Sequence, residues 1–198
     1  MKVLCYGDSN TYGYDPRGPI PGRYDADHRW CDLLAKNTGW TVINEGENGR
    51  KVPEPHWGYP VIRRALSDHA PVDAVCIMLG TNDILLTYRT DVTPIVKRMD
   101  ALLDFLQNGW PGIQLILITP PPLDIPDFPE SEEKLTALIL AYEQLAKDHD
   151  ISFINNQSWN IPLAYDGAHL TEEGNLIFAK YLERELHKCL EISTGETF

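Results

Sequence analysis

Five short apolar runs alternate with longer amphipathic stretches along the 198 residues of the chain. Several of these runs are almost continuously apolar and rich in valine and isoleucine. This composition is typical of parallel strands that are covered on both faces. The runs predict strands at residues 2–6, 40–44, 73–79, 113–118 and 151–155.

The stretches between the runs carry apolar residues at helical spacing. In the first of them, Trp30, Leu33 and Leu34 follow each other at i, i+3 and i+4, and Gly39 lies just past the end. Trp30 is therefore expected in the core, and Thr171 is expected to cap the last helix. The pattern predicts helices at residues 27–37, 58–69, 92–108, 130–148 and 171–190.

Strands that alternate with helices predict an α/β fold, here a three-layer α/β/α sandwich around a five-stranded parallel sheet. The strands are parallel because crossover connections of this kind are right-handed. The length suits one domain, which we expect to span residues 1–198. In open sheets of this class, ligands bind beyond the carboxyl ends of the strands. Polar residues that follow the strands are therefore the first candidates for a functional site.

Net charge, apolar content and cysteine content limit which binding partners and which cellular compartment we expect for the chain. The formal net charge is −12, so the chain should repel nucleic acid and anionic membrane surfaces. No run approaches the roughly 18 consecutive apolar residues of a membrane span. The N-terminus becomes polar too soon for a signal peptide, which predicts a cytoplasmic protein. Neither a disulfide nor a metal site is expected from the four cysteines, Cys5, Cys31, Cys76 and Cys189.

A distinctive polar segment lies beyond each predicted strand. Because parallel strands end at one edge of their sheet, all these segments are expected to meet at that edge. They are GDSN at 7–10, EGENGR at 45–50, GTND at 80–83, TPPPLDIPDFP at 119–129 and DGAH at 166–169.

The first and last segments contain a candidate nucleophile and its base. Ser9 by itself is a weak signal, because most serines in such turns are plain turn residues. At the start of a helix, however, it would also have backbone N–H groups and the positive helix end nearby. His169 can act as its base, and Asp166 lies three residues earlier, where it can orient the imidazole. The remaining histidines are expected to be solvated surface residues; they are His28, His56, His69, His149 and His187.

Acyl transfer also needs hydrogen-bond donors for the developing oxyanion. Asn82 offers a side-chain amide, and Gly49 offers a backbone N–H that no Cβ shields. Ser9 offers its own N–H. Nucleophile, base, orienting acid and donors all fall at one edge of the predicted sheet, which together indicates an acyl-transfer site.

The segments GDSN, NEGENGR, GTND and DGAH, in this order and spacing, resemble the four sequence blocks of the SGNH hydrolases, also called the GDSL esterase/lipase family. The resemblance covers nearly the whole chain. It is strongest to the arylesterase/acyltransferase branch, on RYDADHRW, IMLGTND, TPPPL and DGAHLTEEGN. It implies a flavodoxin-like sandwich, no cofactor and a small-molecule ester as partner. This branch is often oligomeric, so a homo-oligomer is a further expectation.

Carried over by position, the resemblance implies that Ser9 is the nucleophile, that His169 is the general base and acid, and that Asp166 orients it. It implies oxyanion donors at Ser9, Gly49 and Asn82. Gly46 ranks second to Gly49 for this role.

The expected substrate is a short-chain ester, with acetyl esters of phenols or sugars both open. The chain has no long insertion to build a lid, which argues against a triglyceride lipase. The usual leucine after the serine is Asn10 here, which would place a polar side chain near the pocket. Asp8 is expected to cap the first turn or to pair with a basic side chain. The residues expected to line the pocket are Asn10, Tyr12, Tyr14, Thr81, Ala168 and Leu170.

Three alternatives stay open. A carbohydrate O-deacetylase would use the same mechanism with a different pocket. A non-catalytic ligand-binding module on the same fold is disfavoured by the intact set of polar residues. A metal hydrolase could use Asp8, Asn82, Asp83 and His169, since carboxylates, amides and imidazoles all bind cations.

Overall fold

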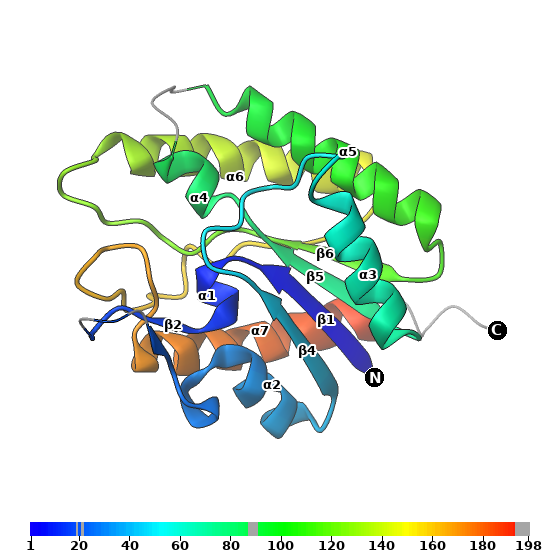
Figure 1. The fold of residues 1–198 in the computed structure, drawn as a ribbon, viewed down its shortest axis with the longest axis horizontal. Coiled ribbons are helices and arrows are strands. Elements are labelled where there is room, and N and C mark those ends of the chain that lie inside the picture. The colour runs from blue at the N-terminus through cyan, green and yellow to red at the C-terminus, as the bar shows by residue number, and fades with distance from the viewer. Residues whose placement is uncertain (19, 21, 87–90, 193–198) are drawn as a thin grey trace.

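A computed structural model describes residues 1–18, 20, 22–86 and 91–192 of the chain. At its centre lies a five-stranded, fully parallel sheet in the order β4-β1-β5-β6-β7 (Figure 1). In sequence order this is the 2-1-3-4-5 arrangement of flavodoxin-like folds, so the predicted fold class is confirmed. The strands are β1 (Lys2–Gly7), β4 (Thr41–Gly46), β5 (Ala74–Met78), β6 (Gln114–Ile118) and β7 (Ser152–Ile154).

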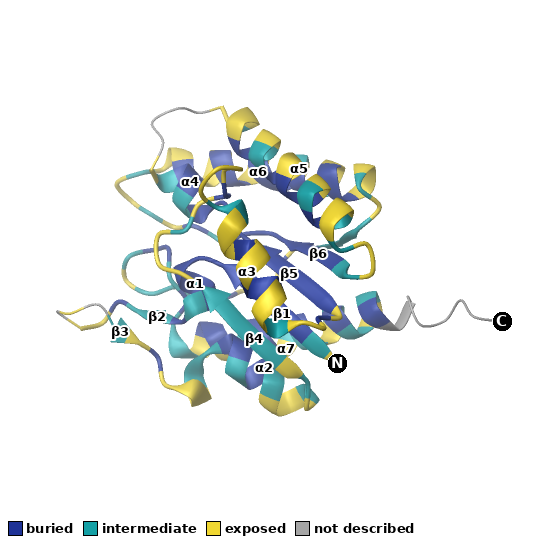
Figure 2. Cartoon of the chain, turned by 45° about the vertical axis from the view of Figure 1, so that its right-hand side comes forward, coloured by how far each residue is buried: buried dark blue, intermediate teal, exposed yellow. Residues whose placement is uncertain are grey.

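The sheet is apolar on both faces because helices cover both. Along β1, Leu4 and Tyr6 contact one core cluster, while Val3 and Cys5 contact the other, as the period-two geometry of a strand requires. The first cluster packs against α3 (Tyr59–His69), α5 (Thr93–Gly109) and α6 (Glu130–Asp148). The second packs against α2 (Trp30–Thr38) and α7 (Glu172–Ile192), and in Figure 2 the buried stripes of the helices face the sheet.

The sequence pattern missed the shortest elements. These are α1 (Ser9–Tyr12), α4 (Thr81–Leu85), the 3-10 turn η1 (Ala26–His28) and the two-stranded ribbon of β2 (Tyr14–Asp15) with β3 (Gly22–Arg23). The helix predicted at 27–37 is in fact η1 followed by α2, because the intervening Arg29 has an extended backbone. Both α1 and α4 begin directly beyond a central strand, so they shape the carboxyl edge of the sheet.

Trp30 and Thr171 lie as predicted, whereas His149 does not. Trp30 is buried, as predicted, and the Thr171 hydroxyl accepts a hydrogen bond from the Gly174 N–H at the start of α7. The expectation of a solvated His149 is wrong. Its side chain is 9% exposed, because its ring bonds to Gln107 and Asp100 on α5. All four cysteines are free thiols, and none of the described helices is long and apolar enough to cross a membrane.

Candidate active site

Ser9 is the first residue of α1, directly beyond the carboxyl end of β1. Asp8 caps this helix, since its carboxylate accepts a hydrogen bond from the Asn10 N–H at 2.9 Å. Gly7 makes the tight turn possible, because a Cβ there would lie 2.0 Å from the Thr11 hydroxyl. Burial raises the pKa of Asp8 to about 6. The serine is thus held on a short, closely packed corner.

Ser9, His169 and Asp166 form a chain of hydrogen bonds. The His169 Nε2 lies 2.9 Å from the Ser9 hydroxyl, and its Nδ1 lies 2.6 Å from Asp166 Oδ2. The other carboxylate oxygen accepts the backbone N–H groups of Ala168 and His169 at 3.1 and 3.0 Å. Burial alone would raise the pKa of Asp166, but these bonds outweigh it and lower the pKa. An ionised Asp166 keeps the proton on Nδ1, which leaves Nε2 to accept from the serine.

Asn10 joins the two chain segments that carry this chain of bonds. Its side-chain amide donates to the Ala168 carbonyl at 3.0 Å, and its amide oxygen accepts from the Leu170 N–H at 3.0 Å. The side chain is buried, at 3% exposure of the residue. Asn10 was expected to line the pocket, but it does not. It fixes the distance between α1, with Ser9, and the segment with His169.

The three expected oxyanion donors surround the same space. Ser9, Gly49 and Asn82 all line one pocket, in which Asn82 comes from the first turn of α4. Gly49 has φ +77, the left-handed region that favours glycine, and a Cβ there would meet nothing within 4 Å. Backbone conformation, and not crowding, is thus the reason for glycine at this position. The N–H of Gly46, which ranked second for this role, is already bound to Asn44 Oδ1 at 2.9 Å.

Arg50 anchors the loop that carries Gly49. Its guanidinium donates to the carbonyl oxygens of Gly7, at 2.9 Å, and of Glu45, and it lies over the Tyr6 ring at 4.1 Å. The carbonyl oxygen of Arg50 in turn accepts from the Asn82 side chain at 3.1 Å. The ends of β1 and β4 and the start of α4 are thereby joined through one residue.

A buried ion pair holds the next part of the same loop. Asp83 Oδ2 accepts from the Val52 N–H at 2.9 Å, and Arg98 binds both the Asp83 carboxylate and the Val52 carbonyl. The side chain of Asp83 is 1% exposed, and burial raises its pKa. The roles of Arg50 and Arg98 could not be predicted from the sequence, because most of their partners are backbone carbonyls, which leave no pattern of residue types.

The pocket around Ser9 has a volume of about 370 Å³. Of the predicted lining residues it includes Tyr14, whose ring centre lies 4.6 Å from that of His169. Three further members were not predicted: Pro16, Asn48 and Tyr165, whose hydroxyl donates to the Pro16 carbonyl at 2.8 Å. The full lining is Ser9, Tyr14, Pro16, Asn48, Gly49, Asn82, Tyr165, Asp166 and His169.

The other residues expected in the lining lie outside it. Thr81, Ala168 and Leu170 are buried. Tyr12 is partly buried, and the Arg23 guanidinium covers its ring at 4.4 Å. These residues are neighbours of the reacting groups in the sequence, but their side chains contact other parts of the protein.

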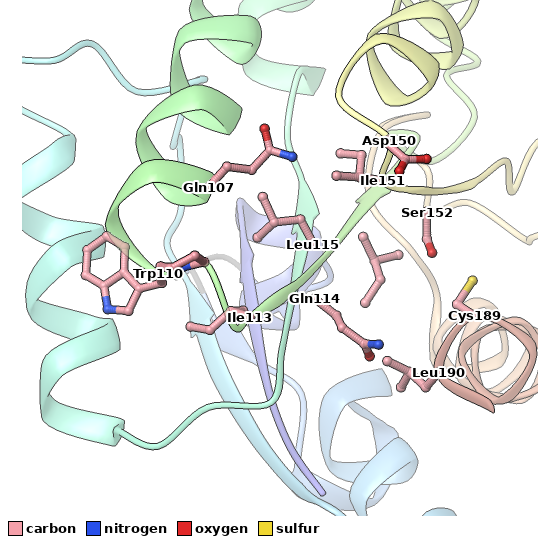
Figure 3. Close-up of a pocket in the computed structure, with 12 residues that line it drawn as sticks. Gln107, Trp110, Ile113, Gln114, Leu115, Asp150, Ile151, Ser152, Cys189 and Leu190 are labelled. Atoms are coloured by element: carbon pink, nitrogen blue, oxygen red, sulfur yellow. The ribbon is translucent and has the colours of Figure 1, made fainter. Parts of the chain in front are cut away.

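A separate cavity of about 280 Å³ lies at the opposite edge of the sheet (Figure 3). Its lining includes Gln114 and Ser152, the first residues of β6 and β7, together with Trp110 and Cys189. The serine pocket lies at the carboxyl ends of the strands. The two cavities are therefore on different sides of the molecule, and no residue of the serine pocket lines the second one.

The residues of the metal-hydrolase alternative are engaged within the protein. The Asp8 carboxylate caps α1, and the Asp83 carboxylate binds Val52 and Arg98. Within residues 1–18, 20, 22–86 and 91–192, no three His, Cys, Asp or Glu side chains are grouped to hold a metal ion.

Comparisons with known proteins agree with the fold and show the family of the chain. The sequence profile of the GDSL-like lipase/acylhydrolase family matches residues 5–177. The chain therefore belongs to this family of acyl hydrolases and esterases.

Individual relatives extend over nearly the whole chain. A GDSL esterase/lipase of Arabidopsis thaliana is 27% identical over 93% of this chain and 85% of its own. An aryl esterase of M. smegmatis has a TM-score of 0.81 at 28% identity, covering 95% of this chain and 99% of that one. Est24, a carbohydrate acetylesterase of Sinorhizobium meliloti, has a TM-score of 0.80 at 27% identity, covering 94% and 98%.

Proposed function

We propose that this protein is a serine esterase that hydrolyses short-chain, acetyl-like carboxylic esters through an acyl-enzyme on Ser9. One observation carries the proposal. The hydrogen-bonded chain from Ser9 through His169 to Asp166 opens into a pocket that Gly49 and Asn82 also line. Nucleophile, base and oxyanion donors are then within reach of one carbonyl group.

In the first step, His169 Nε2 takes the proton of the Ser9 hydroxyl while the serine oxygen attacks the ester carbonyl carbon. The carbonyl oxygen becomes an oxyanion and accepts from the N–H groups of Ser9 and Gly49 and from the Asn82 amide. His169 then donates its proton to the alcohol oxygen as the C–O bond breaks. Asp166 stabilises the imidazolium throughout, since it stays ionised.

In the second step, water attacks the acyl-enzyme and His169 takes its proton. Collapse of the second oxyanion releases the acid and returns the proton to Ser9. An alcohol can replace water in this step, which would give acyl transfer to that alcohol. The balance between the two depends on how well water is excluded from the pocket.

The pocket walls favour small acyl groups with an aromatic or ring-shaped alcohol. Tyr14 and Tyr165 line the pocket and give flat apolar surfaces with polar tips. The volume of about 370 Å³ is at the small end of the range for ligand pockets.

A carbohydrate O-deacetylase is the second candidate. It needs the same chain of Ser9, His169 and Asp166 and differs only in the alcohol. The likeness to a carbohydrate acetylesterase of Sinorhizobium meliloti favours it alongside the aryl esterase function.

The test is hydrolysis of p-nitrophenyl esters from acetate to octanoate by wild type and Ser9→Ala, each with and without EDTA. We expect activity only in the wild type, falling with acyl length and indifferent to the chelator. A Ser9→Ala variant that folds and retains the wild-type rate would refute the nucleophile. Loss of wild-type activity in EDTA would favour the metal hydrolase.

A further inference from the structure

A second cavity adjoins the serine pocket. It has a volume of about 490 Å³ and shares Asn48 and Gly49 with the lining of the serine pocket. We call it the Trp57 cavity; its lining also includes Lys51, Glu54, Trp57 and Arg98. A substrate bound with its carbonyl at Gly49 could therefore extend directly into this space.

Trp57 is held in place although its side chain is open to solvent. The residue is 83% exposed. The N–H groups of Trp57 and Gly58 both donate to the Glu54 carbonyl, at 3.3 and 2.9 Å. Gly58 packs so tightly that a Cβ would lie 2.1 Å from the Cβ of Pro53. A fixed turn thus presents a large aromatic ring to the cavity, where it buries little surface of its own.

Side chains of both charges line the same cavity as this ring. Arg50, Lys51 and Arg98 line the cavity together with Glu47 and Glu54. Arg50 is paired with Glu47 at 2.8 Å, and Arg98 is paired with Asp83. A ligand with a strong net charge would meet like charge here. Neutral hydroxyl groups can donate to the carboxylates and accept from the cations, so both kinds of side chain can bind them.

The ring and the charges together suit a sugar. One face of a pyranose presents C–H groups and can stack on an indole, while hydroxyls project from its rim toward polar side chains. Phenols could stack on Trp57 as well, but they offer fewer hydroxyl groups than a sugar to the charged side chains of the cavity.

We propose that the Trp57 cavity binds the sugar ring of an O-acetylated glycoside, as the alcohol part of the substrate. This inference rests on the proposed function, in which Ser9 takes up a two-carbon acyl group. That group cannot extend into the adjoining cavity, so the part of the substrate in the Trp57 cavity must be its alcohol. When the ester bond breaks, the sugar oxygen takes a proton from His169, and water later replaces the serine oxygen on the acetyl group.

The experiment compares two acetyl esters in four proteins. The esters are p-nitrophenyl acetate, which is too small to fill both cavities, and methyl 2,3,4-tri-O-acetyl-xyloside. The proteins are wild type, Trp57→Ala, Trp57→Phe and the control Leu140→Ala, which removes a side chain that is 64% exposed on α6, outside both cavities.

For Trp57→Ala we expect KM for the acetylated xyloside to rise about tenfold with kcat within twofold. Kinetics on p-nitrophenyl acetate should stay within twofold of the wild type. Trp57→Phe, which keeps a flat ring, should recover most of the affinity, and Leu140→Ala should leave both esters unchanged. Equal effects of Trp57→Ala on the two esters, or none on either, would overturn the proposal.

The outcomes separate this inference from the proposed function. Ser9-dependent hydrolysis of p-nitrophenyl acetate without any hydrolysis of the xyloside would refute the sugar site and leave the esterase proposal standing. If neither ester is hydrolysed, the proposed function fails. Calorimetric titration with unacetylated methyl xyloside then tests the cavity alone. Binding that Trp57→Ala abolishes would support it, and no heat in the wild type would refute it.

Discussion

Arg50→Lys tests whether the loop that presents Gly49 depends on one guanidinium. The Arg50 side chain is 9% exposed and donates to two backbone carbonyls, those of Gly7 and Glu45. Both carbonyls accept from one guanidinium nitrogen, Nη1, while Nη2 donates to Glu47. Lysine keeps the positive charge, but its shorter side chain ends in a single nitrogen that cannot take both places of this planar fork. The substitution therefore removes the hydrogen-bond arrangement of the guanidinium and keeps its positive charge.

The size of the effect follows from the lost contacts. Hydrogen bonds to a charged group contribute about 1.5–3 kcal/mol each, and we expect lysine to keep one of the two. Loss of guanidinium contact with the Tyr6 ring adds about 0.5 kcal/mol. The pair with Glu47 contributes little, because the Glu47 side chain is 65% exposed. Together these give about 2–3.5 kcal/mol.

In a chain of this size, such a loss corresponds to a fall in Tm of about 4–14 °C. Thermal unfolding followed by circular dichroism measures it, with kcat on p-nitrophenyl acetate measured beside it. We expect kcat to fall about tenfold or more, since Gly49 loses its anchor, while KM changes less. The matched control is Arg64→Lys, whose side chain is 83% exposed and paired only with Asp68. It should change Tm by less than about 2 °C.

An unchanged Tm and kcat in Arg50→Lys would show that the loop with Gly49 does not depend on the Arg50 guanidinium. A fall in Tm with kcat intact would show that Arg50 stabilises the fold without positioning Gly49.

Three further substitutions test other parts of the site. Asn82→Ala should lower kcat about 10²–10³-fold with a smaller change in KM, as for other oxyanion donors. A merely structural role would instead lower Tm and leave kcat and KM changed to the same extent. Asp166→Asn should lower kcat about 10⁴-fold at pH 7, because the amide no longer fixes the imidazole tautomer; a loss below tenfold would contradict its orienting role. Asp8→Asn concerns stability. The folded pKa of Asp8 is raised to about 6, so its favourable contribution is complete below about pH 4 and is lost as pH rises through 6. The variant should gain Tm relative to wild type at pH 8, and this gain should shrink toward pH 4; a pH-independent difference would contradict the raised pKa.

Much of the scaffold is predictable from the sequence because long periodic segments carry strong signals. The apolar runs placed all five strands, and the alternation with helices gave the parallel sheet. The short elements escaped because α1 has four residues and α4 has five, too few for a helical period to be visible. Yet these two helices carry Ser9 and Asn82, and they are recognisable only from the polar residues that follow the strands.

Individual side chains were harder to predict than the edge of the sheet at which they lie. Asn10 was expected in the pocket, but its partners, the backbone of Ala168 and Leu170, come from the other end of the chain. His149 was expected in solvent, and this failed for the same reason: its partners on α5 are distant in the sequence. Trp57 gave no helical or strand signal, and its place beside the serine pocket follows only from the path of the loop after β4.

Covalent labelling of Ser9 tests most directly whether this serine is the nucleophile. The protein is incubated with a p-nitrophenyl phosphonate ester, and p-nitrophenol release, residual esterase activity and intact mass are followed together. We expect one phosphonyl group per chain on the peptide that contains Ser9, activity lost in proportion to labelling, and no labelling of Ser9→Ala. Full esterase activity in a protein labelled at Ser9, or inactivation with the label on another residue, would contradict the account.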